Sequence, residues 1–203
     1  ANTVAFLVEP IQGEAGIIVP PAGYLKAARG LCRTNRVVFV ADEIQCGLGR
    51  SGKWFVYQHA GVLPDVVPLA KGLAGGVPVG ACAAGRRAKG VFKPGNHGST
   101  FGGNPLAMAG VVTTIDTMKE QDLLGNAERV GQVIRDGLAR ELAGVSGVRE
   151  IRGMGLMIGM ELDRTCTDLV KLGLERGLVF NVTADTVIRM LPPLIMSEAE
   201  GRQ

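Results

Sequence analysis

Residues 37–45 are VVFVADEIQ, and residues 65–76 are DVVPLAKGLAGG. Each stretch contains a short apolar run rich in valine, which predicts a buried strand, although Pro68 weakens the second assignment. About a helix's length of chain separates the runs, and this spacing favours neighbouring strands of a parallel sheet. Asp42 and Lys71 directly follow the two runs. Because ligands bind outside the carboxyl ends of parallel strands, we expect both side chains to face one crevice.

A lysine and a carboxylate in one crevice have a specific chemical use. A partly desolvated lysine can lose its proton and form a Schiff base with a carbonyl group. A neighbouring carboxylate can hold a cationic ring nitrogen. A pyridoxal phosphate site requires these two groups. Spacing alone leaves a second interpretation open, in which Asp42 caps a helix and Lys71 is solvated.

Four motifs, in this order, resemble those of the class-III (ornithine-type) aminotransferases. They are VEPIQGE at 8–14, ADEIQCGLGRSG at 41–52, AKGLAGG at 70–76 and HGSTFGGNP at 97–105. The resemblance covers nearly the whole chain, and NVTA at 181–184 with RMLPPL at 189–194 resembles the acetylornithine branch of that family. It implies an α/β fold of PLP-transferase type I, which is aspartate-aminotransferase-like. The chain would hold part of the mixed sheet of the large domain and an α+β C-terminal domain.

The resemblance implies roles for the residues around the two strand ends. Lys71 would hold pyridoxal phosphate and then move the substrate proton as general acid and base. Asp42 would hold the pyridinium nitrogen, and Glu43 belongs to the same cofactor-binding stretch. Ile44 would pack against one face of the ring, and Gln45 would lie near the ring oxygen.

The stretch HGST at residues 97–100 precedes an expected helix start, since Asn104 suits the N-cap and Pro105 the first helical position. Hydroxyls and free backbone amides near a helix start can hold a phosphate. A serine–threonine turn without a ligand is the alternative. The resemblance implies that Thr100 binds the cofactor phosphate across a dimer interface and that Ser99 lies beside the substrate.

Glu14 and Arg189 are the remaining candidate substrate residues. Arg189 lies in an apolar stretch, where an unpaired guanidinium would be costly. A structural ion pair with a nearby carboxylate is one interpretation. The resemblance implies another, in which Arg189 binds the α-carboxylate of glutamate. Glu14 would then cover that arginine when the other substrate presents an amine.

The resemblance implies a transaminase that moves the side-chain amino group of N-acetylornithine to 2-oxoglutarate, a reaction of arginine biosynthesis. Its partners would be the amino donor, the 2-oxo acid and a second copy of the chain in a homodimer with shared active sites. Ornithine aminotransferase, succinylornithine aminotransferase and glutamate-semialdehyde aminomutase are the alternatives within the family. A truncated, non-catalytic chain that only pairs with another chain is the alternative from a different class.

The composition is that of an ordinary globular chain of 203 residues, 46% hydrophobic and 20% charged, with a formal net charge of +3. It lacks a basic run interleaved with aromatics, so nucleic acid is not an expected partner. No apolar run reaches the length of a membrane span. The four cysteines form no CxxC pair and lie far from the histidines, which argues against a metal site and fits a reducing cytoplasm.

The first strand is expected at Thr3–Val8, so close to the start of the chain that another part of the family fold should precede it. We therefore expect the chain to be roughly the second half of that fold. A domain boundary is expected inside the helix that starts at Pro105. Residues 1–108 would continue the cofactor-binding large domain, and residues 109–203 would form an incomplete small domain.

Hydrophobic periodicity predicts which faces of the later elements are buried. A second helix has an apolar stripe from Ala127 to Leu142, with Arg135 on its solvated face. Every second residue from Leu156 to Leu162 is a large apolar one, which predicts a half-buried strand. Residues 77–84 predict a strand antiparallel to the one before Lys71. The helix from Pro105 to about Lys119 is expected to bury Met108, Val111, Val112, Ile115 and Met118.

Overall fold

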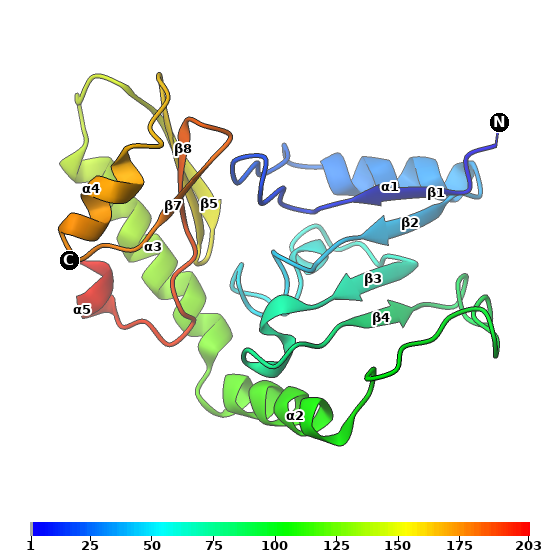
Figure 1. Ribbon diagram of the computed structural model, residues 1–203. Coiled ribbons are helices and arrows are strands. Elements are labelled where there is room, and N and C mark those ends of the chain that lie inside the picture. The colour runs from blue at the N-terminus through cyan, green and yellow to red at the C-terminus, as the bar shows by residue number, and fades with distance from the viewer. Residues whose placement is uncertain (1) are drawn as a thin grey trace. The chain divides into compact units, whose positions relative to one another are not determined.

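The computed structural model describes residues 2–203, which fold as two compact units (Figure 1). Unit 1 comprises the residues up to Pro10 together with Pro20–Leu48 and Lys53–Gln121. Unit 2 comprises Ile11–Val19, Gly49–Gly52 and Asp122–Gln203. Two short excursions from the first part of the chain therefore belong to unit 2.

Unit 1 is built on a four-stranded mixed sheet. Its elements are β1 (Ala5–Val8), α1 (Tyr24–Thr34), β2 (Val38–Ala41), η1 (Val56–Gln58), β3 (Val66–Leu69), η2 (Lys71–Ala74), β4 (Ala81–Ala84) and α2 (Pro105–Glu120). The strand order is β1-β2-β3-β4, in which β1, β2 and β3 are parallel and β4 is antiparallel to β3. The parallel strands before Asp42 and Lys71 and the antiparallel strand after Lys71 are both confirmed.

A hydrophobic core in unit 1 lies between α1 and the sheet (Figure 1). Phe39 of β2 is fully buried there, and Leu25 and Cys32 reach it from α1. Val8 and Ala41 complete the cluster from β1 and β2. Because burial of apolar surface stabilises by about 25 cal/mol per Å², this cluster holds α1 against the two strands.

Asp65 is a buried charge that ties α1 to the sheet. Its carboxylate accepts hydrogen bonds from Arg29 Nη1 and Nη2 at 2.8 and 3.1 Å and from Phe39 N at 2.9 Å. Arg87 Nη1 adds a contact of 3.3 Å. The two guanidinium groups and the amide offset the cost of burying the carboxylate. These partners lie 22 to 36 residues away in the chain, so no local pattern predicts the role.

The helix α2 begins as predicted. The Asn104 side chain accepts a hydrogen bond from Ala107 N at 3.0 Å, and Pro105 occupies the first turn. The boundary expected between residues 108 and 109 would divide this helix. The compact unit instead continues to Gln121, because α2 packs on η2.

The predicted apolar stripe of α2 is wrong in part. Met118 is buried, whereas Met108 and Val112 are 37% and 59% exposed. The helix contacts η2 through small residues, since a Cβ built on Gly110 would lie 3.4 Å from Ala74 Cβ. Close approach of small residues, and not burial of the largest ones, therefore determines which face of α2 packs inward.

Unit 2 contains a four-stranded antiparallel sheet with helices, as the predicted α+β layer requires. The strand order is β5-β6-β8-β7. Within residues 2–203, no helix combines the length and apolarity needed to cross a membrane. The elements are α3 (Leu123–Glu141), β5 (Val148–Met154), β6 (Met157–Leu162), α4 (Leu169–Glu175), β7 (Asn181–Thr183), β8 (Val187–Met190) and α5 (Glu198–Gly201).

The strand β6 is buried more deeply than its alternating pattern predicts. Residues 156–158 are all fully buried, so the half-buried prediction for residues 156–162 is wrong at its start. The strand is an inner one, paired with β5 and β8. Val130 of α3 packs in the cluster at the start of β6, and Ile17 from the first excursion contacts Gly159. The neighbours thus cover side chains that a half-exposed strand would leave in water.

The turn between β5 and β6 approaches its neighbours too closely for a side chain. Gly155 has a φ of +54°, and a Cβ built there would lie 2.5 Å from Arg50 O. Arg135, which was expected on the solvated face of α3, instead donates Nη1 to Gly155 O at 2.8 Å. The glycine therefore allows a backbone contact that also engages an arginine of α3.

Candidate active site

Asp42 and Lys71 lie at the same end of the unit 1 sheet, next to the carboxyl ends of two inner strands. Asp42 directly follows β2, and Lys71 opens η2 just after β3. Because β2 and β3 are parallel, with Val40 opposite Val66, their carboxyl ends lie side by side at that end of the sheet. Ligands of α/β sheets bind just outside the carboxyl ends of the strands. The topology therefore places both residues where the sequence predicts them.

The Asp42 side chain forms a local turn and does not cap a helix. Its Oδ1 accepts a hydrogen bond from Ile44 N at 3.0 Å, and residues 44–51 continue in turns. The helix-cap interpretation is therefore wrong. The bond engages one of the two carboxylate oxygens and fixes the half-buried side chain at the strand end.

Lys71 has an unusual backbone conformation. Its φ is +52°, in the left-handed region that non-glycine residues seldom occupy. Such a conformation costs about 1–3 kcal/mol and is often found at functional sites. The residue is exposed in this chain and not partly desolvated. Strained backbone, and not burial, therefore distinguishes this lysine.

Glu43 is directed into the protein and away from the sheet edge. It is fully buried, and its carboxylate accepts from Val56 N and Tyr57 N at 3.0 Å each and from Cys46 Sγ at 3.3 Å. Consecutive side chains at a strand end point to opposite sides. The prediction that Glu43 binds the cofactor is therefore wrong for its side chain, which instead fixes η1 to the segment that carries Asp42.

The residues that follow Glu43 share this close packing. Ile44 and Gln45 are half-buried in the turn. A Cβ built on Gly47 would lie 2.7 Å from Glu43 O and 2.9 Å from Glu43 Cβ. Any side chain there would displace Glu43, so this glycine serves the packing of the turn.

Glu43 should make the stability of the protein depend on pH. Burial raises the pKa of this carboxyl, although the amides of Tyr57 and Val56 and the thiol of Cys46 oppose the shift. The folded state then keeps the proton to a higher pH than the unfolded state. The resulting stabilisation is complete below the unfolded pKa and is lost as pH rises through the folded pKa.

The variant Glu43→Gln cannot ionise and should lack this decline. In urea unfolding between about pH 4 and about pH 8, the free energy of unfolding of the wild type should fall relative to that of Glu43→Gln as pH rises. The change is at most about 1.4 kcal/mol per pH unit. Glu120→Gln, an exposed change on α2, is the matched control. A difference between wild type and Glu43→Gln that stays constant over this range would contradict the assignment.

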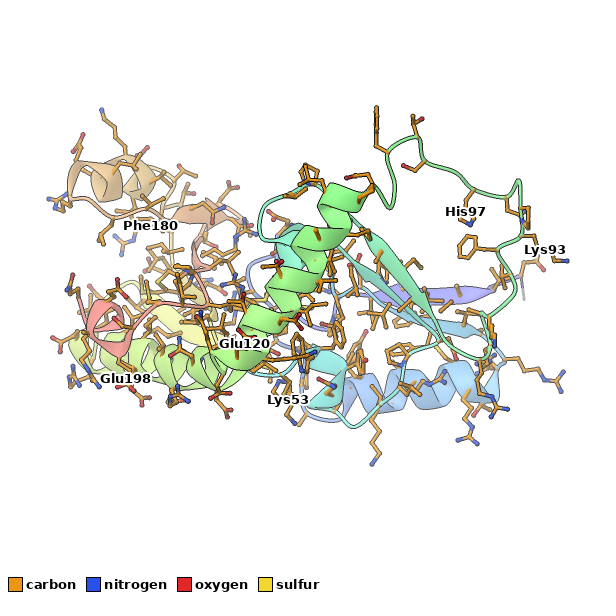
Figure 2. The ribbon with its side chains drawn as sticks, turned by 90° about the horizontal axis from the view of Figure 1, so that it is seen from below. Lys53, Lys93, His97, Glu120, Phe180 and Glu198 are labelled. Carbon is orange, nitrogen blue, oxygen red and sulfur yellow. The ribbon has the colours of Figure 1, made fainter. Side chains whose placement is uncertain are left out.

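Ser99 and Thr100 lie in the exposed loop between β4 and α2, on which Figure 2 labels His97. Ser99 Oγ accepts from Gly102 N at 3.0 Å, so a serine turn forms there. Within residues 2–203, no hydrogen bond links Ser99 or Thr100 to Lys71. The phosphate-binding role of Thr100 and the substrate role of Ser99 stay predictions.

Glu14 and Arg189 form an ion pair inside unit 2. Arg189 Nη1 donates to Glu14 Oε1 at 2.6 Å, across 175 residues of sequence. The Arg189 side chain is 9% exposed and that of Glu14 is 70% exposed. A buried cation is therefore covered by a carboxylate that reaches it from the solvent side. The ion pair agrees with both sequence-based interpretations, and the exposure of Glu14 favours a counter-ion that can move away.

The motif NVTA orients this pair. Asn181 lies opposite Arg189 in the β7–β8 register, and its Oδ1 accepts from Arg189 Nε at 3.0 Å. Thr183 Oγ1 donates to the backbone oxygen of Glu14. One residue of β7 thus orients the guanidinium, and another holds the loop that carries the carboxylate.

Arg152 anchors the Glu14 loop and was not predicted as a site residue. Its Nη2 and Nε donate to Gly16 O at 2.7 and 3.1 Å. Its Nη1 pairs with Glu161 Oε2 at 2.5 Å and Glu150 Oε2 at 2.7 Å. The two carboxylates orient the guanidinium toward the loop. Glu150, two residues before Arg152 on β5, is the one feature of the local sequence that indicates a paired arginine.

Comparison with known proteins identifies the family. The family model described as aminotransferase class-III matches residues 1–203. The chain belongs to this family. This match confirms the family membership that the four sequence motifs predicted.

Curated relatives match nearly the whole class-III chain. The acetylornithine aminotransferase of Nitrosomonas europaea is 49% identical over 200 residues, which are 98% of this chain and 51% of the relative. Acetylornithine aminotransferase 1 of Bordetella pertussis is 51% identical over 100% of this chain and 51% of its own. The ornithine aminotransferase of an Exiguobacterium species is 49% identical over 98% of this chain and 50% of its own. The chain therefore spans about half the length of the curated relatives it matches.

Solved structures give the same coverage and establish the fold. The ornithine aminotransferase of Toxoplasma gondii has a TM-score of 0.93 and 44% identity, over 98% of this chain and 48% of its own. The acetylornithine aminotransferase of Elizabethkingia anophelis has a TM-score of 0.91 and 40% identity, over 97% of this chain and 53% of its own. The mixed α/β fold is therefore a part of the PLP-transferase type I fold, which is aspartate-aminotransferase-like.

Proposed function

We propose that this chain carries the cofactor lysine and the substrate arginine of a pyridoxal-phosphate aminotransferase. The observation that carries the proposal is the placement of Asp42 and Lys71 at the carboxyl ends of adjacent parallel strands. Family membership supports it, and the solved Toxoplasma gondii relative is described with PLP at its active site.

The residues at the sheet edge fit this cofactor. Asp42 offers a carboxylate with one oxygen held by Ile44 N, so its negative charge has a fixed position for a cationic ring nitrogen. Lys71 offers an exposed primary amine at the neighbouring strand end. Ile44 and Gln45, in the half-buried turn, would contact the ring face and the ring oxygen. Glu43 takes no part, because its carboxylate is bound inside the protein.

Each residue then has a defined task. Bound pyridoxal phosphate supplies an electron sink for the substrate carbon that loses its proton. Lys71 Nζ would hold the cofactor before substrate arrives and would afterwards carry the proton from that substrate carbon to C4′ of the cofactor. Asp42 would keep the ring nitrogen protonated through its negative charge.

The proposed reaction transfers the side-chain amino group of N-acetylornithine to 2-oxoglutarate, a reaction of arginine biosynthesis. Relatives named acetylornithine aminotransferase support this donor, while a relative named ornithine aminotransferase keeps ornithine as the second candidate. Arg189 would bind the α-carboxylate of glutamate, and Glu14 would neutralise Arg189 while the other donor reacts.

Further parts of the proposal rest on the family alone. Thr100 would bind the cofactor phosphate in a homodimer with shared active sites, and Ser99 would lie beside the substrate. Unit 1 would belong to the large domain and unit 2 to the small domain. A cytoplasmic location stays a prediction.

A donor comparison tests the function. The holoenzyme is given 2-oxoglutarate with N-acetylornithine, ornithine or succinylornithine, and the glutamate formed is measured. We expect the highest kcat/KM with N-acetylornithine. A preference for ornithine or succinylornithine would reassign the donor. Glutamate formation from none of the three, despite bound cofactor, would contradict the proposed function.

Removal of the Glu14 carboxylate should change substrate choice. Glu14→Ala leaves Arg189 without the ion pair of 2.6 Å, so the α-carboxylate of the amine donor can dock there in the wrong orientation. A charge-assisted hydrogen bond contributes about 1.5–3 kcal/mol, which predicts a shift in preference of roughly 10- to 150-fold. Stopped-flow measurement of each half-reaction should show glutamate reacting at the same rate or faster, with loss of regiospecificity for the diamine-type donor.

Asp163→Ala is the matched control, because it removes another solvent-accessible carboxylate of unit 2, one that pairs with Arg164 at 2.7 Å. This variant should change neither half-reaction. Equal losses in both half-reactions of Glu14→Ala, with regiospecificity intact, would mean that Glu14 only supports the fold.

A further inference from the structure

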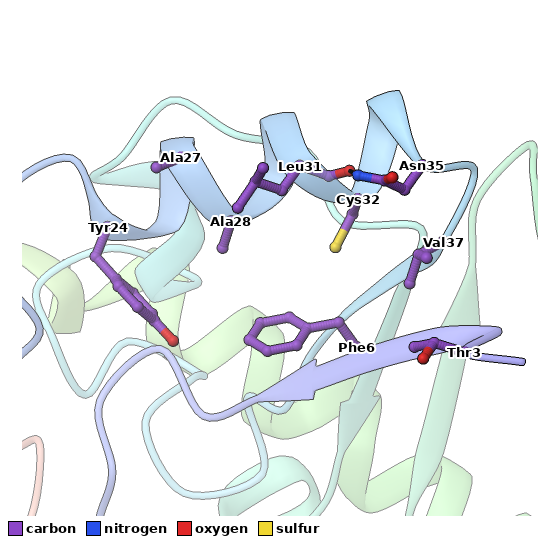
Figure 3. A pocket seen from close by; sticks show the side chains of 9 residues that line it. All are labelled: Thr3, Phe6, Tyr24, Ala27, Ala28, Leu31, Cys32, Asn35 and Val37. Carbon is purple, nitrogen blue, oxygen red and sulfur yellow. Dashed lines mark hydrogen bonds between the residues drawn. The ribbon is translucent and has the colours of Figure 1, made fainter. Parts of the chain in front are cut away.

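The cavity between β1 and α1 offers no charged group to a substrate. It has a volume of about 660 Å³, and in Figure 3 the Phe6 ring lies between strand and helix with Cys32 pointing toward it. None of the nine described residues that line it is charged, and all belong to unit 1. Substrate carboxylates are held best by charged partners, and the ion pair of Glu14 and Arg189 lies in unit 2. Under the proposed function, the choice between substrates therefore depends on how this ion pair is held.

The Glu14 loop, meaning residues 12–18, is closed at its base. Gln12 and Ile18 exchange two backbone hydrogen bonds of 3.1 and 3.0 Å. The side chain of Ile17 is fully buried. The side chain of Glu14, in contrast, is 70% exposed. The backbone of the loop is thus fixed at its two ends, while the carboxylate that it carries reaches into solvent.

Arg152 holds this loop by its backbone oxygens. Its Nε donates to Gly16 O and Ile17 O at 3.1 Å each, and its Nη2 donates to Gly16 O at 2.7 Å. The Arg152 side chain is 10% exposed, so these bonds are shielded from water and are stronger than similar bonds at the surface. A Cβ built on Gly16 would lie 3.3 Å from Nη2. The guanidinium therefore packs directly against the loop backbone.

Two carboxylates fix the other side of the same guanidinium. Glu161 and Glu150 lie opposite each other in the β5–β6 register, and both accept from Arg152 Nη1, at 2.5 and 2.7 Å. Nη1 is thus engaged by the sheet, while Nε and Nη2 are engaged by the loop. A planar guanidinium can make all these bonds at once, whereas an ammonium has a single nitrogen. The arginine therefore joins the loop rigidly to the sheet.

The strand β7 holds both partners of the ion pair. Thr183 Oγ1 donates to Glu14 O, and Asn181 Oδ1 accepts from Arg189 Nε at 3.0 Å. Movement of the whole loop would break the bonds from Thr183 and Arg152 together, whereas rotation of the Glu14 side chain leaves them in place. The ion pair can therefore open by rotation of one exposed side chain while the loop stays still.

We propose that Arg152 is a positioning residue that sets the choice between the two substrates. By holding the Glu14 loop still, it keeps the Glu14 carboxylate within reach of Arg189. The inference rests on the proposed function, in which Glu14 covers Arg189 while the amine donor reacts. It extends that function by naming the residue that determines how often the substrate arginine is covered.

Arg152→Lys tests the proposal in the holoenzyme. Lysine keeps a cation beside the two carboxylates, but its single nitrogen cannot also bind Gly16 O and Ile17 O. Stopped-flow half-reactions give the second-order rate constants with glutamate and with N-acetylornithine, and the ratio of the first to the second measures substrate choice. We expect this ratio to rise about 3- to 10-fold, because a loose loop leaves Arg189 uncovered more often.

The double variant Glu14→Ala/Arg152→Lys separates positioning from support of the fold. Without the Glu14 carboxylate the anchor has nothing to position, so the ratio should equal that of Glu14→Ala alone. A purely structural Arg152 would instead lower both rate constants together and leave the ratio unchanged. Arg149→Lys is the matched control, because Arg149 also lies on β5 and contacts Glu161 at 3.8 Å. It should leave the ratio at the wild-type value.

Hydrogen exchange of the substrate-free holoenzyme reports on the loop without turnover. The amide of Ile18, which donates to Gln12 O at 3.0 Å, should exchange about 3- to 10-fold faster in Arg152→Lys than in the wild type. Exchange at this amide should be unchanged in Arg149→Lys. Unchanged exchange in Arg152→Lys would overturn the inference, because the loop would then be held without the arginine.

The outcomes distinguish this inference from the proposed function. A ratio that shifts in Glu14→Ala but not in Arg152→Lys would overturn the inference alone. A ratio that Glu14→Ala itself leaves unchanged would contradict the role of Glu14 in the proposed function, and the inference would fail with it. Multiplied effects of the two changes in the double variant, or an equal rise in Arg149→Lys, would also overturn the inference.

Discussion

Replacement of Lys71 by alanine should abolish the covalent retention of pyridoxal phosphate. A stable link requires a primary amine at the sheet edge, and η2 places Lys71 there directly after β3. After borohydride reduction and digestion, the wild-type protein should carry the cofactor on the peptide that contains Lys71, and Lys71→Ala should carry none. Loss of the proton-transferring group should also reduce kcat by at least about 100- to 10,000-fold.

Three control variants separate the amine from its charge and from lysine content. Lys71→Arg keeps a cation but cannot supply a neutral amine, since a guanidinium stays protonated. It should behave like Lys71→Ala. Lys53→Ala and Lys93→Ala remove lysines elsewhere in unit 1 and should retain the labelled peptide. A label on Lys53 or Lys93 in the wild-type protein would show that the site assignment is wrong.

Loss of the Asp42 charge should slow the chemical step far more than it weakens substrate binding. Removal of one partner from a buried ion pair costs on the order of 3–5 kcal/mol, which corresponds to roughly a 100- to 1000-fold fall in kcat or more. The carboxylate also accepts from Ile44 N, so Asp42→Ala removes a turn contact as well as a charge. Asp42→Asn keeps an acceptor for that amide and removes the charge alone.

Both Asp42 variants should therefore lose kcat to a similar extent, with KM changed much less, when steady-state rates are measured in the holoenzyme. Near-normal turnover of Asp42→Asn with slow turnover of Asp42→Ala would assign Asp42 to the turn. Near-normal turnover of both would contradict the role at the ring nitrogen.

Local patterns were sufficient for the strand ends and the helix starts. The valine-rich run before Asp42 ends where β2 ends, because a parallel strand that is buried on both faces consists of consecutive apolar residues. Asn104 and Pro105 predicted the start of α2 because the cap is formed within a single turn. The positions of Asp42 and Lys71 could therefore be predicted, because Asp42 directly follows β2 and Lys71 comes two residues after the end of β3.

The direction of side chains could not be predicted in the same way, because it depends on distant neighbours. Glu43 turns inward to amides 13 and 14 residues away. Met108 and Val112 of α2 are exposed because the helix packs on η2 through Gly110. Arg152 binds the Glu14 loop across more than a hundred residues. In each case the composition of the covering element, and not the local period, decides the outcome.

The two excursions into unit 2 have a consequence for inheritance. The chain passes between the units five times, at Pro10, Val19, Leu48, Gly52 and Gln121. A single recombination at Gln121 would transfer α3 and the antiparallel sheet but leave Ile11–Val19 and Gly49–Gly52 behind. Arg189 would then face a foreign loop in place of its own Glu14. Chimeras between relatives should therefore stay intact only when all three segments of unit 2 are exchanged as one block.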